Sequence, residues 1–108
     1  MANRLLIAGI AVALLAVPTS LRADVTAGKA AYDKTCKSCH GAEGKGNPVM
    51  AKAMKVEIRP LGSSEVQAKN DAAITKDITQ GMGKMKPVKN LAAGDVKSVV
   101  EFVRTLKN

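Results

Sequence analysis

The clearest alternation of apolar and polar positions lies near the end of the chain. Between Ala93 and Leu106, apolar residues recur at intervals of three and four, which puts them on one face of a helix: Val96, Val99, Val100, Val103 and Leu106. Asp95 near the start and Lys107 near the end favour the same helix through its dipole. The pattern predicts a packed C-terminal helix.

Three further helices are predicted from spacing and from their end signals. The segment from Asp24 to Cys39 has helical spacing, and His40-Gly41 ends it. A short helix is expected from Val49 to Val56. A longer one is capped by Asn70 or Asp71, carries Ile74 and Ile78 one turn apart, and stops at Gly81.

The connections between these helices contain glycine and proline. Gly41, Gly44 and Gly46 precede Asn47-Pro48 in one loop, residues 58–64 form a turn-rich connection, and residues 84–93 are irregular. No strand pattern and no internal repeat is present. We therefore expect an all-α chain with one domain.

The first 23 residues have the layout of a secretory signal peptide. Arg4 precedes an apolar stretch from Leu5 to Val17, then come Pro18 and small residues near Ala23. A retained membrane anchor is the alternative, although an apolar stretch of about 13 residues is short for a span of about 20. We expect cleavage after Ala23, which leaves residues 24–108 as the mature domain and no stable membrane insertion.

The chemistry of the chain is indicated by Cys36-Lys37-Ser38-Cys39-His40. Two cysteines three apart, followed directly by histidine, are the pattern that attaches a c-type haem through two thioether bonds and supplies an imidazole to iron. A zinc site would need about four ligands, but the chain has no third cysteine and no second histidine. A redox dithiol would follow a strand, and a structural disulfide would leave His40 unused.

Composition agrees with a buried cofactor. Tyr32 and Phe102 are the only aromatic residues, and Leu, Ile and Val are sparse between Val25 and Ile74. About 85 residues with so few large apolar side chains would make a weak interior. A porphyrin would supply the missing apolar mass, so the haem-free chain is expected to be largely unfolded.

The chain is strongly basic. Without Arg4 and Arg22, 15 basic side chains face nine acidic ones, a net charge of about +6. Nucleic acid is an unsuitable partner because aromatic interleaving, arginine clusters and nucleic-acid motifs are all missing. The excess of lysine over arginine favours diffuse steering towards acidic protein surfaces.

Taken together, these motifs resemble those of a bacterial class I cytochrome c over essentially the whole mature chain. The resemblance rests on the signal peptide, Gly28 and Tyr32 in the first helix, the haem motif, the methionine loop and the final helix ending Phe102-Val103-Arg104-Thr105-Leu106. It implies about four short helices around one covalent haem c, with the first and last helices crossing. It also implies that Gly28 faces Phe102 beside Tyr32, and that the protein works in the periplasm.

The iron ligands follow from exclusion and from the resemblance. His40 is the only histidine, so the opposite ligand is expected to be methionine. Met50 and Met54 are expected to fill the core, which leaves Met82 and Met85. The family places its ligand in a loop after the third helix, usually before proline. Met85 is preferred although Lys86 separates it from Pro87, and Met82 is the alternative.

The resemblance implies a one-electron carrier between redox proteins, neither an enzyme nor a binder of small-molecule substrates. Alternatives are a haem-bearing subunit of a larger oxidoreductase and a gas-binding protein with a displaceable methionine. His40 is expected to donate a hydrogen bond to a carbonyl near Pro48, and Arg59 either contacts a haem propionate or is solvated. Five lysines are expected around the haem edge: Lys37, Lys45, Lys84, Lys86 and Lys89.

Overall fold

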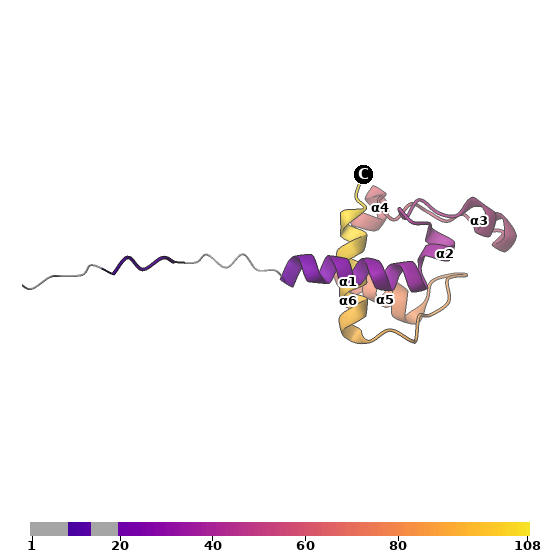
Figure 1. Ribbon diagram of the computed structural model, residues 1–108. Helices are drawn as coiled ribbons and strands as arrows, with labels where there is room; N and C mark the ends of the chain where they lie inside the picture. Colours follow the sequence, from indigo (N-terminus) through magenta and orange to yellow (C-terminus); the bar gives the residue numbers. More distant parts are fainter. Residues whose placement is uncertain (1–8, 14–19) are drawn as a thin grey trace, which may run out of the picture.

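A computed structural model describes residues 9–13 and 20–108 (Figure 1). Its helices are α1 (Ser20–Thr35), α2 (Lys37–His40), α3 (Pro48–Met54), α4 (Ser64–Gln67), α5 (Asp71–Gln80) and α6 (Ala93–Thr105). Within the described ranges there is no strand, only an isolated bridge between Met82 and Met85. The predicted all-α class is confirmed. The two short helices α2 and α4 raise the number above the four that were expected.

The predicted signal peptide lies mostly outside the described residues, so its cleavage stays a prediction. Helix α1 begins at Ser20, upstream of the expected cleavage position after Ala23. None of the helices in the described ranges combines the length and the apolar character that crossing a membrane requires.

The first and last helices cross and pack against each other, as predicted (Figure 1). Gly28 stands at the crossing: a Cβ atom added there would lie 1.9 Å from the Ser98 carbonyl oxygen and 3.1 Å from the Phe102 Cβ. The rings of Tyr32 and Phe102 pack beside it with centroids 4.9 Å apart and planes tilted by 55°. The predicted meeting of Gly28, Phe102 and Tyr32 is thus confirmed, and the Ser98 backbone completes it.

The buried core is small and lies almost entirely on three helices. Helices α2, α3 and α4 bury no residue of their own. Met50 and Met54, predicted to fill the core, are half-buried and lie outside it, because α3 stands away from the crossing (Figure 1). The core consists of Tyr32, Cys36, Ile74, Ile78, Val96, Val99, Val100, Phe102 and Val103.

Local contacts determine where α3 begins and ends and where α5 begins. The Asn47 side chain accepts hydrogen bonds from the backbone N–H groups of Val49 and Met50, and Pro48 occupies the first turn, so α3 begins there. It ends at Lys55, which has a left-handed backbone with φ 55°. Of the two predicted caps of α5, it is Asn70 that accepts from the Ala73 N–H, and Asp71 is the first residue of the helix.

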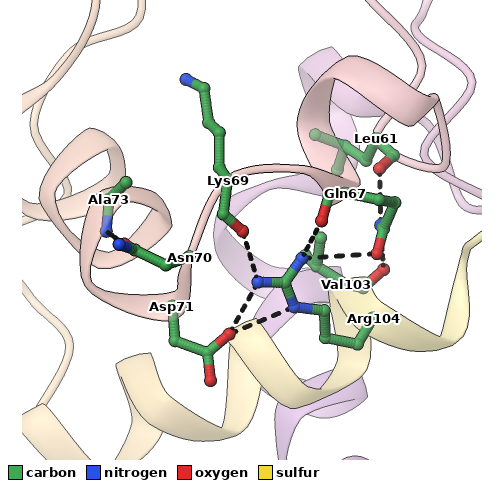
Figure 2. Close-up of polar contacts among 8 residues, drawn as sticks. All are labelled: Leu61, Gln67, Lys69, Asn70, Asp71, Ala73, Val103 and Arg104. Carbon is green, nitrogen blue, oxygen red and sulfur yellow. Dashed lines mark hydrogen bonds and ion pairs between the residues drawn. The ribbon is translucent and has the colours of Figure 1, made fainter.

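Arg104 joins α6 to the connection between α4 and α5 (Figure 2). Its guanidinium donates to the carbonyl oxygens of Gln67 at 2.9 Å and Lys69 at 2.6 Å, and to the Asp71 carboxylate at 2.8 Å. The Gln67 amide in turn donates to the Val103 carbonyl at 3.1 Å. These bonds satisfy the carbonyls of Gln67, the last residue of α4, and of Lys69 after it, and they fix the start of α5 against α6.

After α5 the chain forms a tight hairpin, defined here as residues 82–85. Met82 and Met85 exchange both backbone hydrogen bonds, at 3.0 Å and 2.9 Å. Gly83 has φ 57° at the first central position, as a type II′ turn requires. The segment between α5 and α6 extends to the side of the molecule where α2 and α3 lie (Figure 1). The hairpin begins two residues before the segment 84–93 that was predicted to be irregular, and it shares only Lys84 and Met85 with that segment.

Candidate haem site

The cysteine and histidine motif forms a single helical turn directly after α1. The His40 N–H donates to the Cys36 carbonyl at 3.0 Å, and the Gly41 N–H donates to the Lys37 carbonyl at 2.8 Å. Cys36, Cys39 and His40 therefore stand at positions i, i+3 and i+4, which share one face of a helix. Local backbone bonding alone brings two thiols and an imidazole together.

Both thiols are free. Cys36 is buried with 8% exposure, and this burial raises the pKa of its thiol. Its Sγ lies 3.3 Å from the Thr35 Oγ1, while Cys39 is half-buried beside the Ser38 hydroxyl at 4.0 Å. Two free thiols on one face, one buried in the core and one at its border, fit the two attachment points of a porphyrin.

The His40 imidazole has no protein hydrogen-bond partner among the described residues. Its Nδ1 is buried and unpaired, and burial lowers the pKa of the ring, which favours the neutral imidazole with a free lone pair. The expected bond to a carbonyl near Pro48 is not formed. Pro48 is the first residue of α3, so its carbonyl belongs to the hydrogen-bond ladder of that helix. A neutral, unpartnered imidazole fits an iron ligand.

The loop after the motif folds back and holds it. The Gly46 N–H donates to the His40 carbonyl at 2.7 Å, and the Asn47 N–H donates to the Cys39 carbonyl at 2.8 Å. From α1, the Tyr32 hydroxyl donates to the Gly41 carbonyl at 2.6 Å. Positive φ at Gly41, Gly44 and Gly46 makes this return possible, as the sequence predicted. The turn is therefore fixed from both sides.

The two candidate methionines differ in their surroundings. Met85 is half-buried and packs against the core cluster. Met82 is 58% exposed, and its Sδ lies 3.8 Å from the Lys69 Nζ. Gly81, with φ 79°, is required before the hairpin, because a Cβ atom there would lie 2.6 Å from the Met85 carbonyl oxygen. The environment favours Met85 over Met82 as the residue that faces inward.

The lysines expected around the site are all exposed. Lys84 differs from the others because its ammonium donates to the Met54 carbonyl at 2.6 Å and so joins the hairpin to the end of α3. Lys45 pairs with Glu43 at 3.2 Å. Arg59 forms an exposed ion pair with Glu65.

Some of these contacts could not be found from the sequence. Arg104 directly follows Val103, a member of the apolar stripe of the last helix. Its position at the border of that stripe is the only signal in the sequence that it contacts another segment. The bonds from Lys69 to Asp77 and Met82, and from Lys84 to Met54, join residues 8, 13 and 30 positions apart. No spacing rule relates such residues to each other.

The crossing end helices, the helical turn that carries both thiols and the histidine, and the methionine hairpin define a class I c-type cytochrome. The family model for cytochrome c matches residues 25–107, so the chain belongs to the cytochrome c family. The solved structure of the KustC0563 c-type cytochrome is similar, with 30% identity, a TM-score of 0.63, and coverage of 75% of this chain and 98% of that chain. No curated protein matches. Membership means a haem-based electron-transfer protein with covalent haem c, its iron, and redox protein partners.

Proposed function

We propose that this cytochrome is a periplasmic one-electron carrier and not an enzyme. Cys36 and Cys39 would hold the haem through thioether bonds, and His40 and Met85 would be the two protein ligands of its iron. The observation that carries the proposal is that both thiols and the unpartnered imidazole share one helical turn. Residues 1–23 act as an export signal, and residues 24–108 form the carrier domain.

The bound haem supplies iron that accepts and releases a single electron. With His40 and Met85 as its two ligands, the iron would have no position open for a substrate. A neutral imidazole and a neutral thioether add no negative charge to the iron, and the soft thioether favours the ferrous state. Covalent attachment directly after α1 would keep the cofactor bound while redox partners associate and dissociate.

The hairpin presents Met85 and restricts its movement. Two backbone bonds close the hairpin, packing against the core holds the Met85 side chain, and Lys84 joins the hairpin to α3. A ligand carried on a segment fixed at several points needs little rearrangement when the iron changes its charge. Small rearrangement is the property that a fast carrier requires.

Absorption spectra of the oxidised protein test the ligand assignment. The wild type should show the far-red iron–sulfur charge-transfer band, Met85→Ala should lose it, and Met82→Ala should keep it. Mass spectrometry should detect one haem added to the chain in all three proteins. Loss of the band in Met82→Ala alone would contradict Met85 as ligand, and a chain without a covalent adduct would contradict the whole proposal.

A further inference from the structure

The hairpin carries two methionines, whereas the haem iron would take only one thioether ligand. Met82 and Met85 are directly opposed in an antiparallel pair that exchanges both backbone hydrogen bonds. Opposed residues of such a pair carry their side chains on the same face, about 5.5 Å apart at Cα. Methionine is also long and flexible. The backbone of the hairpin by itself therefore does not decide which of the two sulfur atoms faces inward.

A lysine contacts the methionine that faces outward. The Lys69 ammonium lies 3.8 Å from the Met82 Sδ, within the reach of an N–H···S hydrogen bond. Met82 remains 58% exposed, whereas Met85 packs against the core. A thioether that accepts from this ammonium is held beside it, and turning inward to a metal would cost that hydrogen bond.

Lys69 is held through both its side chain and its backbone. Its ammonium forms an ion pair with the Asp77 carboxylate of α5 at 2.7 Å. Its carbonyl accepts from Arg104 at 2.6 Å, so its backbone belongs to the junction that ties α4 and α5 to α6 (Figure 2). An ammonium anchored in this way holds its position at the base of the hairpin.

We infer that Lys69 is a positioning residue that keeps the Met82 thioether outside the haem site and so determines that Met85 is the iron ligand. This inference rests on the proposed function, because it takes Met85 to be the ligand in the wild type. Lys69 touches neither ligand. It acts by occupying the sulfur of the competing side chain.

The haem-loaded double variant Lys69→Ala/Met85→Ala tests the inference against Met85→Ala. With Lys69 present, Met82 stays outside and the charge-transfer band is lost. Without Lys69, Met82 turns inward, and the band should be at least about fivefold stronger than in Met85→Ala, the effect of one lost hydrogen bond on an equilibrium. Lys69→Arg/Met85→Ala keeps the donor and should resemble Met85→Ala. Lys76→Ala/Met85→Ala is the control for charge, because Lys76 is exposed on α5 and has no ion pair among the described residues.

The outcomes separate the two proposals. If the band is equally absent from Met85→Ala and Lys69→Ala/Met85→Ala, the role of Lys69 is refuted while Met85 stands as ligand. If Met85→Ala keeps the full band, the ligand assignment is wrong, and the role of Lys69 falls with it. Recovery in the Lys76 control to the same extent would show a general charge effect and would also refute the inference.

Nuclear magnetic resonance with methyl-labelled methionine provides a second measurement in which Met85 is intact. A methyl group over the porphyrin of the reduced protein is shifted upfield by the ring current. The wild type should show one such methyl, and Lys69→Ala should show a second, weaker one that disappears in Lys69→Ala/Met82→Leu. A single unchanged upfield methyl in Lys69→Ala would overturn the inference.

Discussion

At the scale of the residue, Gly28 has no room for a side chain. The Ser98 carbonyl occupies the space where its Cβ would stand, at 1.9 Å, and a backbone atom cannot move aside without shifting α6. We expect Gly28→Ala to lower the free energy of unfolding by about 3 kcal/mol or more. Urea unfolding of the haem-loaded protein measures this change.

Gly94 gives the matched control. It also lies in a helix of the crossing pair, but nothing stands within 4 Å of the Cβ it would gain. Gly94→Ala should therefore raise the free energy of unfolding by about 0.5–1 kcal/mol, the usual gain of alanine over glycine in a helix. Similar losses in both variants would show that the crossing does not depend on a missing side chain.

Tyr32 predicts a dependence of stability on pH. Burial raises the pKa of its hydroxyl from 10.0 to about 12, so the folded state keeps the proton where the unfolded state has lost it. The contribution of Tyr32 is complete below pH about 10 and is lost as the pH rises towards 12. The loss amounts to about 2–3 kcal/mol over that window.

Tyr32→Phe isolates this effect because the ring packing is kept. At pH 7 the variant should be about 1 kcal/mol less stable, since the hydrogen bond to the Gly41 carbonyl is missing. Above pH about 11 it should be the more stable protein. Urea unfolding of both proteins at several pH values measures the difference, and a difference that stays constant with pH would contradict the argument.

At the scale of the element, one hydrogen bond joins the hairpin to the end of α3. Lys84→Ala removes the bond to the Met54 carbonyl, and the backbone N–H groups of Met82 and Met85 should then exchange with solvent about fivefold faster. Hydrogen exchange of the haem-loaded protein measures this. Lys86→Ala removes an equal charge two residues later, just outside the hairpin, and should leave both rates unchanged. Equal effects would mean that charge, and not the bond, holds the hairpin.

The helices themselves follow from the sequence to a large extent. The stripe from Val96 to Leu106 and the Asn70 cap predicted α6 and α5 with accurate bounds, because period and caps are local signals. The helix from Ser64 to Gln67 was missed, since one turn capped by Ser63 has no period to detect. The haem motif could be predicted because attachment chemistry fixes its spacing. The hydrogen bonds from Arg104 to three residues of another segment could not be predicted, because they depend on how distant elements pack.

At the scale of the whole molecule, the apolar core is unevenly distributed, and most of it lies on α1, α5 and α6. Helices α2, α3 and α4 bury no residue, so residues 37–67 have no apolar interior of their own. A Cys36→Ala/Cys39→Ala chain, which cannot attach haem, should therefore lose most of its helical far-ultraviolet circular dichroism and melt without a cooperative transition. A cooperative melt like that of the loaded protein would contradict the expectation.

The net charge of the proposed carrier domain, about +6 without Arg4 and Arg22, belongs to the same scale. Electron transfer with an acidic protein partner should slow by at least about fivefold as ionic strength rises from about 10 mM to about 300 mM, because screening weakens steering. Stopped-flow kinetics measure the rates. Lys37→Glu should reduce the low-salt rate, whereas Lys97→Glu on α6 is a control of equal charge change. Rates indifferent to salt would refute docking by charge.

The crossing of α1 and α6 also orders events in time. A chain made from its N-terminus presents α1 long before α6 exists, so the face around Gly28 has nothing to pack on until residues 93–105 have been synthesised. A porphyrin attached to Cys36 and Cys39 during that interval would be enclosed afterwards, when α6 packs across α1.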